Sequence, residues 1–416
     1  MYIYETSRIS HGDSILYIAR DDAGKALFVT GHGEAFDTLD GEITQNSKRC
    51  PLTNANTKII RRLFPFTNPV SHKGRKFTIG LGDRLGLASA GHIRLIRDMD
   101  VFPVLAQQSI RELNLTGRTY EDVLSAAVWA VFQEGYTKGY GADGDHLKTR
   151  EEVKMALDQG FTMITLDCSE HIPNGLEAII KFAVSIYDEF IRGTDIDFEL
   201  SIDETQTVTS PEDHRYVAKE LEKANIKPVS LAPRFCGEFQ KGIDYRGDVN
   251  EFEKEFAIHV QIAKESGYKI SVHSGSDKFA VFPIIYRETD KNVHIKTAGT
   301  NWLEALRVIA QKTPDLFREI HIFALKNLTE AKKYYHTTEN TSNIPDINTL
   351  TDEELPSLLD QDDARQVLHI TYGLILSEKN NDGTSKFKDI IYKTLNEYEA
   401  DYYEALEKHI KRHIFA

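Results

Sequence analysis

The sequence predicts an α/β protein whose centre is a (β/α)8 TIM barrel. From residue 77 onward, short runs rich in β-branched and aromatic residues alternate with segments of helical periodicity. This is the order expected of a parallel sheet built from βα units. Eight strand-like runs fall within about 250 residues, which is the usual size of such a barrel. An open, doubly wound sheet shows the same alternation and is left as the alternative.

The predicted strands are short and rich in apolar residues. They span residues 77–82, 137–142, 161–167, 197–203, 228–233, 269–273, 292–297 and 319–324. Residues 101–106 offer a ninth run, but Pro103 is unfavourable inside a sheet, and residues 107–113 have a helical pattern. This segment fits either a strand or a helical insertion between the first two strands, so the strand count is open by one.

Helices are expected between the strands, at residues 120–134, 150–159, 175–191, 211–224, 250–264 and 301–311. Three of them carry a start signal. Thr149 and Thr300 are hydroxyl residues placed to cap a helix, and Ser210 is followed by Pro211, which suits the first helical position.

The two ends of the chain differ from this pattern. Residues 1–76 mix β-like runs at 15–19 and 26–30 with turn residues, which predicts an N-terminal cap region containing β structure. Beyond residue 330 a polar stretch precedes helical segments at 370–376 and 386–413. We therefore expect a catalytic barrel at 77–330 and a C-terminal helical extension at 331–416 that covers part of it.

The composition narrows the classes of function. The 416 residues carry a formal charge of −14, which opposes a nucleic acid partner. Cys50, Cys168 and Cys236 are widely spaced and form no CxxC pair, so neither a disulfide framework nor a thiolate zinc site is indicated. The sequence starts without a signal-peptide pattern and has no apolar run of about 18 residues, which predicts a cytoplasmic protein without a membrane partner. A homo-oligomer is compatible with all of this.

Polar side chains recur at the carboxyl ends of the predicted strands, where barrel enzymes assemble their sites. They occur in three motifs, at residues 141–148 (GADGDHLK), 271–278 (SVHSGSDK) and 294–299 (HIKTAG). Side chains alternate across a strand, so Val293 and Ile295 on the outer face send His294 and Lys296 into the barrel. The same alternation turns Glu199, Ser201 and Asp203 inward.

His146, His273 and His294 are the expected ligands of a divalent cation, which would be Zn²⁺, Mn²⁺, Ni²⁺ or Co²⁺. Each of them alone also fits a hydrogen-bonded core histidine, and His321 competes for the same role. A carboxylate ligand could come from Glu204, Asp167 or Asp143.

Asp145, Glu204 and Glu238 are the candidate acid/base groups. Asp145 also fits a turn, and the two glutamates also fit solvated loops.

The candidate cations for a substrate carboxylate or phosphate are Arg84, Arg234, Lys278 and the inward Lys296. Surface ion pairing is the ordinary alternative for any one of them. Residues 80–86 (GLGDRLG) lack the spacing of a phosphate-binding loop, so their glycines are expected only to let the backbone approach a ligand.

Several blocks together resemble the bacterial tagaturonate/fructuronate epimerase family. They lie at residues 80–88 and 91–94, 142–149, 232–235 and 241–245, 273–279, and 294–300. The resemblance implies a metal-dependent hexuronate 4-epimerase that interconverts D-tagaturonate and D-fructuronate, with Asp145 as proton acceptor beside metal ligand His146. The small-molecule partner would then be a sugar acid.

The implied chemistry fits the residues. The hydroxyl at C4 is β to the C2 ketone, so the C4 hydrogen is not acidic and a retro-aldol route is expected, aided by a metal acting as Lewis acid. The rivals are a class II aldolase or isomerase acting on a sugar phosphate, and a non-catalytic barrel that binds sugar acids. NAD-dependent epimerisation is disfavoured because no GxGxxG motif follows an early strand.

Overall fold

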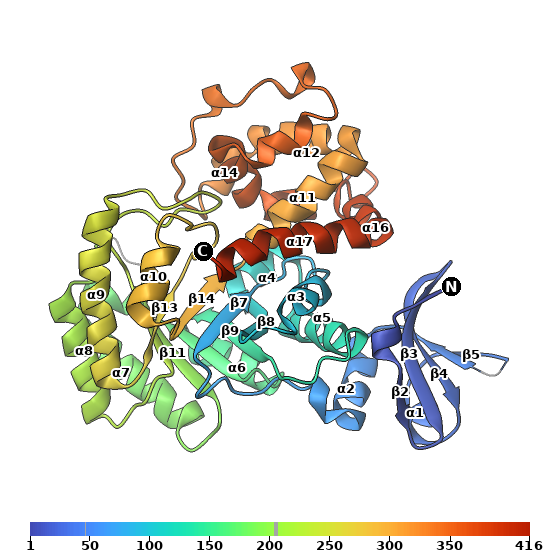
Figure 1. The fold of residues 1–416 in the computed structure, drawn as a ribbon, viewed down its shortest axis with the longest axis horizontal. Helices are drawn as coiled ribbons and strands as arrows, with labels where there is room; N and C mark the ends of the chain where they lie inside the picture. Colours follow the sequence, from blue (N-terminus) through green and yellow to red (C-terminus); the bar gives the residue numbers. More distant parts are fainter. Residues whose placement is uncertain (46, 204–206) are drawn as a thin grey trace.

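The computed structural model describes residues 1–45, 47–203 and 207–416, and a closed barrel of eight parallel strands forms its centre (Figure 1). The strands follow one another around the ring in the order β10-β11-β12-β13-β14-β7-β8-β9. They are β7 (Phe77–Leu81), β8 (Phe102–Ser109), β9 (Gly141–Leu147), β10 (Met163–Asp167), β11 (Asp197–Ile202), β12 (Ser230–Pro233), β13 (Lys269–Val272) and β14 (Val293–Thr297). The predicted (β/α)8 barrel is confirmed, because the ring of strands closes.

One predicted strand is wrong. Residues 319–324 belong to helix α12 (Pro314–Lys326), whose buried residues recur at the spacing of one helix face: Phe317, Ile320, His321 and Ala324. Ile320 and Ile322 alternate as in a strand with one buried face. Ile320 is buried but Ile322 is exposed, as expected for two residues on different faces of a helix.

The eighth strand is instead β8, the run that the sequence left open. Pro103 is the second residue of β8 and pairs with Ile79 of β7. Just beyond it, between Val104 and Ala106, the pairing of β8 with β9 is irregular. A proline is tolerated near the start of a strand and beside such an irregularity, because few ladder hydrogen bonds are lost there. The predicted helix of the insertion follows as α4 (Ile110–Thr116).

The strand predicted at residues 137–142 lies later in the chain. β9 begins at Gly141 and contains the polar motif that was expected to follow it. Gly144 makes this possible, because an added Cβ would lie 2.9 Å from both the Ala156 Cβ and the Leu147 Cδ1. A glycine here lets β9 pack closely against helix α6 (Arg150–Asp158), while Asp143 and Asp145 occupy alternate positions on the same strand.

The helices of the barrel layer match most of the predictions. They are α3 (Ser89–Ile96), α5 (Tyr120–Gln133), α6, α7 (Leu176–Ile186), α8 (Pro211–Lys223), α9 (Val249–Ser266), α10 (Phe282–Thr289) and α11 (Thr300–Lys312). Thr149 caps α6 in a capping box with Glu152, and Ser210 caps α8 ahead of Pro211. Thr300 begins α11, but Gly299 holds the cap position and no side chain caps the helix.

The N-terminal region forms an antiparallel sheet beside the barrel, at the right of Figure 1. Its elements are β1 (Tyr2–Ile3), β2 (Ile9–His11), β3 (Ser14–Asp21), β4 (Gly24–Gly31), α1 (Glu34–Thr38), β5 (Glu42–Thr44), β6 (Ser47–Cys50) and α2 (Asn54–Leu63). The predicted β runs are confirmed as β3 and β4. Lys25 and Tyr4 both bind the Glu399 carboxylate, at 2.5 Å each, which ties the sheet to the C-terminal helices.

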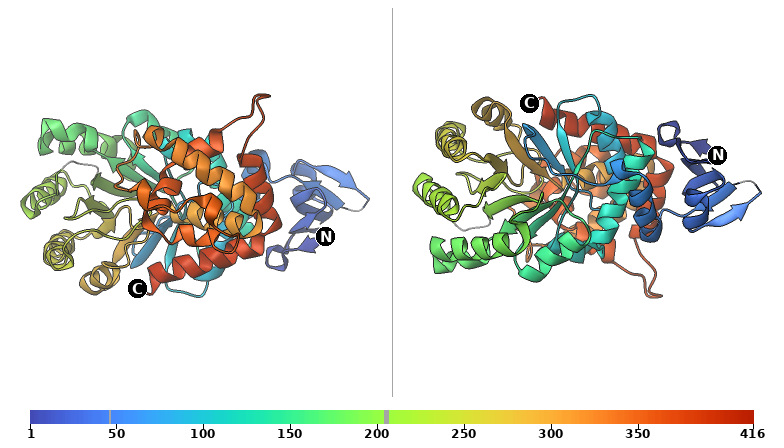
Figure 2. Two further views of the ribbon diagram at one scale, coloured as in Figure 1. Left: turned by 90° about the horizontal axis from the view of Figure 1, so that it is seen from above. Right: turned by 90° about the horizontal axis from the view of Figure 1, so that it is seen from below.

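The C-terminal region lies across the end of the barrel at which the strands finish (Figures 1 and 2). Its helices are α13 (Leu328–Ala331), α14 (Asp362–Ile370), α15 (Tyr372–Ser377), α16 (Lys388–Glu397) and α17 (Glu399–Ile414). In the described ranges, no helix is both long enough and apolar enough to cross a bilayer.

A buried ionic network fastens this region to the barrel. Asp277 follows β13 and accepts a hydrogen bond from Arg365 of α14 at 2.7 Å, while His409 of α17 lies 2.7 Å from its other oxygen. Burial disfavours a charged His409, but Asp277 and Glu304 outweigh this and raise its pKa to about 9. We call Asp277, Arg365, His409 and Glu304 the C-terminal clasp.

The C-terminal clasp has a structural role. His413 is close enough to Asp277 and His409 for the three to share a cation. Its Nε2 accepts the Asp277 backbone N–H at 3.0 Å, however, and its Nδ1 donates to the His409 carbonyl at 3.1 Å. Both ring nitrogens of His413 are therefore engaged within the protein.

Replacing Asp277 by alanine is expected to lower the free energy of unfolding by about 3–5 kcal/mol, because Arg365 and His409 would keep buried charges without their shared carboxylate. Urea unfolding measures this loss. The matched control is Asp158→Ala, which breaks the exposed pair with Lys154 and should cost no more than about 1 kcal/mol. Equal losses in the two variants would contradict the clasp.

Candidate active site

A cavity of about 240 Å³ opens where the strands of the barrel end. A narrower cavity of about 50 Å³ continues it, and His146, His273 and Tyr335 line both. Barrel enzymes bind their substrates at this end because the βα loops converge there. Tyr334, Tyr335 and His336 also line the larger cavity, so the C-terminal extension closes one side of it.

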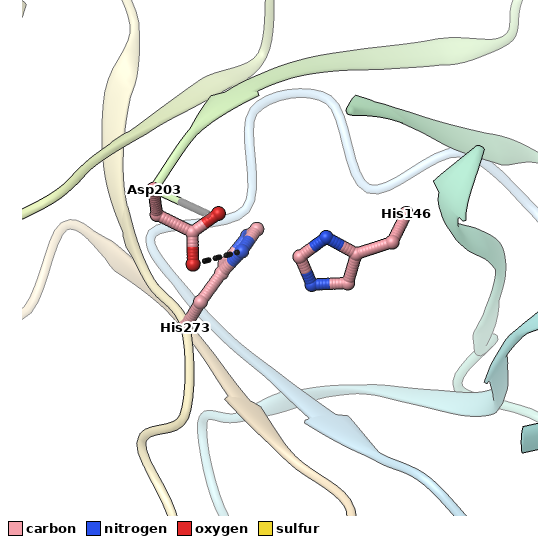
Figure 3. Close-up of side chains that lie close together, drawn as sticks. All are labelled: His146, Asp203 and His273. Atoms are coloured by element: carbon pink, nitrogen blue, oxygen red, sulfur yellow. Dashed lines mark ion pairs between the residues drawn. The ribbon is translucent and has the colours of Figure 1, made fainter. Parts of the chain in front are cut away.

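His146, Asp203 and His273 meet in this cavity (Figure 3). One nitrogen or oxygen atom of each lies within 4.8 Å of the others, and the two imidazole centroids are 4.8 Å apart. His146 belongs to β9, while Asp203 and His273 directly follow β11 and β13. His146 has a φ of 51°, a left-handed conformation that is uncommon for a residue other than glycine and turns its ring to face His273 in Figure 3.

A carboxylate holds the other nitrogen of each imidazole. The His146 Nδ1 lies 3.3 Å from Asp167, and the His273 Nε2 lies 2.7 Å from Glu199. This arrangement leaves the His273 Nδ1 toward the cluster, where it is buried and has no hydrogen-bond partner among the described residues. The Asp203 carboxylate is 3.2 Å away from it. Histidines that bind metals are commonly oriented in this way by a carboxylate.

The electrostatics of the cluster favour a positive charge between the three residues. Burial alone would lower the pKa of His273, but the Asp203 carboxylate and Glu199 outweigh it and raise the pKa to about 9. Burial likewise opposes an ionised Asp203, yet His273 and His146 hold its pKa well below the usual range. A cation at this point would find two imidazoles and an ionised carboxylate, a donor set that suits Zn²⁺ and similar divalent metals.

Lys296 organises the floor of the site. Its ammonium lies 2.7 Å from Asp143, 2.8 Å from Asp145 and 3.0 Å from Glu199, and it also donates to Thr165. Burial favours the neutral form of both aspartates. It prevails at Asp143, whose pKa rises to about 6, whereas Lys296 and His146 lower the pKa of Asp145 to about 2. Asp145 is therefore held as an anion, 3.8 Å from the His146 Nε2.

The structure brings only some of the predicted ligands together. His294 is outside the cation cluster, so Asp203 takes the place expected for it. His294 lies deeper in the barrel, where its Nδ1 meets the Thr78 hydroxyl at 2.8 Å and its ring stacks on His72. His321 is buried on α12, against Phe317.

The structure also brings only some of the predicted acid/base and substrate-binding residues to the cavities. Glu238 and Arg234 line the larger cavity, whereas Glu204 lies outside the described residues. Arg84 lines the narrower cavity, where it pairs with Glu112 at 2.9 Å.

Lys278 does not line either cavity, which is a correction to its predicted role in substrate binding. Its ammonium is fully buried and donates to the backbone carbonyls of Gln240, Ile243 and Ser276 at 2.7–2.9 Å. It fixes the loops around the site, and burial lowers its pKa to about 7.

Other residues of the site had no predicted role. Arg111, Gln240, Lys241, Tyr335 and His336 line the larger cavity. The Arg111 guanidinium lies 4.9 Å from the centre of the Tyr335 ring, and the Tyr335 hydroxyl is 3.1 Å from that of Tyr372. No strand or helix period marks Tyr335 or His336 in the sequence, because they lie in an irregular segment.

Comparisons with known proteins show the family of the chain. A model of the tagaturonate epimerase family matches residues 4–179 and 175–416. The tagaturonate/fructuronate epimerase of Thermotoga maritima is 36% identical and aligns with 99% of this chain and 96% of its own. Two crystal structures of the fructuronate-tagaturonate epimerase UxaE from Cohnella laeviribosi, one native and one with a glycerol molecule, are 45% identical and superpose with TM-scores of 0.97. Each covers 99% of this chain and 96% of its own.

The match extends over the barrel, the N-terminal sheet and the C-terminal extension alike, so it is a match of the whole chain. A barrel that binds sugar acids without turnover is thereby ruled out. The protein is an epimerase, an enzyme of the isomerase class, and it belongs to the tagaturonate epimerase family.

Proposed function

We propose that this epimerase inverts C4 of a ketohexuronate and so interconverts D-tagaturonate and D-fructuronate. The names of its relatives support this choice of substrate. The observation that carries it is the meeting of His146, Asp203 and His273 with the Asp145–Lys296 pair in one cavity. These groups supply a cation site, a carboxylate anion and a fixed ammonium at neighbouring positions.

The three clustered residues are the proposed ligands of a divalent cation, which we expect to be Zn²⁺, Mn²⁺, Ni²⁺ or Co²⁺. The donor types, the buried His273 Nδ1 facing the Asp203 carboxylate and the two carboxylates behind the imidazoles support this assignment. When bound, such a cation would act as a Lewis acid on substrate oxygens.

The position of the C4 hydroxyl, β to the ketone, requires the C3–C4 bond to break, because the C4 hydrogen is not acidic. In the proposed reaction Asp145 accepts the hydroxyl proton, the C3–C4 bond cleaves to an aldehyde and an enediolate, and the aldehyde rotates before C3 adds to its other face. The new alkoxide then regains a proton. Glu238 lines the same cavity and is the proposed second acid/base group.

Asp145 is a weak base on its own, since its pKa is about 2. Lys296 touches both Asp143 and Asp145, and the pKa of Asp143 is about 6. We propose that a proton reaching Asp145 moves through Lys296 to Asp143. Asp143 is more basic than Asp145, so it holds the proton more tightly after the transfer.

Both fragments must stay bound between cleavage and re-addition. Arg111, Arg234 and Lys241 line the larger cavity and are the proposed partners of the C6 carboxylate. Holding the aldehyde fragment by its carboxylate keeps the reacting carbons at a high effective concentration.

The proposal is tested by incubating EDTA-treated and metal-restored protein with D-fructuronate and following the products by NMR. We expect D-tagaturonate to form only with metal. Equal rates in the EDTA-treated, metal-free protein would overturn the metal assignment. Accumulation of three-carbon fragments would instead favour an aldolase.

The route predicts the fate of the hydrogen at C4. In D2O, the product should contain no deuterium at C4, because the C4–H bond is never broken. Mass spectrometry and ²H NMR of the product locate any label. Deuterium at C4 after one turnover would contradict carbon–carbon cleavage and point to deprotonation at that carbon.

A further inference from the structure

The opposite mouth of the barrel, where the strands begin, contains an open groove of about 920 Å³. The loops that lead into β7, β12, β13 and β14 form its walls. In the view from below in Figure 2, the C-terminal helices lie behind the barrel, so this mouth is separate from the active site. Neither the epimerase reaction nor the C-terminal clasp uses the groove.

The groove is strongly basic in a chain whose formal charge is −14. Six cationic side chains line it, against the single carboxylate of Asp290: Lys73, Arg75, Lys76, Lys227, Lys264 and Lys269. Asp290 is itself paired with Lys76 at 2.6 Å. Like charges that gather against the sign of the whole protein raise the local concentration of a counter-ion.

The buried ammonium of Lys269 is the feature of the groove that most favours a bound ligand. This first residue of β13 is only 8% exposed, and its ammonium donates to the Arg75 carbonyl at 3.1 Å and the Thr78 hydroxyl at 3.0 Å. An ammonium has three protons to donate, and in the described part of the chain Lys269 forms no ion pair. Burial of the ammonium is costly and lowers the pKa of Lys269 to about 8, although the carboxylates of Asp197 and Glu199 act against this shift.

Two buried carboxylates offset part of this cost. Asp197 and Glu199 attract the Lys269 ammonium from a distance, and the Asp197 oxygens also accept hydrogen bonds from the Ser71 hydroxyl and the His72 backbone N–H, both at 2.6 Å. His72 lines the groove and is neutral, because burial lowers its pKa to about 3. With two acceptors for its three protons, the Lys269 ammonium therefore keeps one proton for a further acceptor at the buried end of the groove.

We propose that this groove binds an oligophosphate, with Lys269 at its buried end and Lys73, Arg75 and Lys227 along its exposed walls. Several linked phosphate groups match a row of cations better than a single carboxylate does, because each cation meets its own anionic oxygens. The groove has the volume of a typical small-ligand site. Such a chain could be a free inorganic triphosphate or the tail of a nucleotide.

Calorimetric titration of the whole protein with inorganic triphosphate tests the proposal. We expect saturable binding that weakens with added salt. The variant Lys73→Gln, Arg75→Gln, Lys227→Gln should bind at least about tenfold more weakly, because it removes three exposed cations of the groove. The matched control is Lys181→Gln, Lys219→Gln, Lys254→Gln, which removes three exposed lysines elsewhere and should bind like the unaltered protein.

Both triple variants should keep the full epimerase rate, which shows that they are folded. The absence of saturable binding, equal weakening in the two variants, or unchanged binding in the groove variant would each overturn the proposal. Titration with ATP separates the two sources, since tighter binding of ATP would assign the site to a nucleotide and equal binding to the phosphate chain alone.

The buried end of the groove has its own test. Triphosphate should raise the melting temperature of the unaltered protein by mass action, and this rise should be largely lost in Lys269→Met. The rise in each protein is measured from its own melting temperature without ligand. A full ligand-induced rise in this variant would contradict the role of Lys269.

Discussion

Replacing His273 by alanine is expected to lower kcat/KM by a factor on the order of 10³ or more and to remove the bound divalent cation. His273 offers the buried Nδ1 that faces Asp203, and Glu199 holds its other nitrogen at 2.7 Å. Without the imidazole, only His146 and Asp203 remain of the cluster. The measurement is the metal content of the purified variant together with its rate on D-fructuronate.

His294→Ala is the matched control, because His294 is the inward histidine that the sequence first placed in the metal site. It lies deeper, beside Thr78 and His72, and this variant should keep its metal although it loses some stability. Loss of metal from His294→Ala with metal retained in His273→Ala would contradict the ligand set. Asp203→Asn, which keeps the size of the side chain, should weaken metal binding without unfolding the protein.

The second large effect is expected from Lys296→Met. Lys296 lies within 3.0 Å of three buried carboxylates, on Asp143, Asp145 and Glu199. Without the ammonium these charges repel one another, so we expect the free energy of unfolding to fall by about 3–5 kcal/mol. The rate should fall by about 10²-fold or more, because the proposed acceptor Asp145 loses the group that positions it.

Urea unfolding and steady-state kinetics measure the two effects separately. Lys296→Arg keeps the charge and should recover most of the stability but little of the rate, since a guanidinium has a different shape and stays protonated. Lys154→Met, on the exposed face of α6, is the control and should change neither quantity appreciably. A Lys296→Met variant with the full rate would remove Lys296 from the mechanism.

Much of the fold could be predicted because buried strands and amphipathic helices leave regular patterns. The exceptions have physical causes. Residues 319–324 alternate like a strand but form part of a helix whose buried face is set by tertiary packing. β8 was left open because Pro103 is unfavourable in a strand, and only the irregular pairing beside it shows why it is tolerated.

The site was less predictable, because alternation gives the face of a strand and not the depth of a residue within the barrel. His294 and Lys296 both point inward from β14, but only Lys296 lines the cavity. Asp203 was expected to face inward, yet no pattern in the sequence distinguished it as a candidate ligand.

Contacts between residues far apart in sequence explain the other differences between the predicted and the observed site. Lys278 follows the proposed metal ligand His273 closely in sequence, but its ammonium donates hydrogen bonds to three backbone carbonyls. Tyr335 comes from a segment without periodicity and reaches the cavity only because the C-terminal region folds back over the barrel.

The proposed mechanism depends on a divalent cation bound by His146, Asp203 and His273 together. Anomalous diffraction from crystals of the metal-loaded enzyme, recorded at the absorption edge of the metal, tests it most directly. We expect one strong peak bonded to the imidazole nitrogens of His146 and His273 and to an oxygen of Asp203. A fully active enzyme whose anomalous peak lies elsewhere, or that shows no peak between these three side chains, would contradict it.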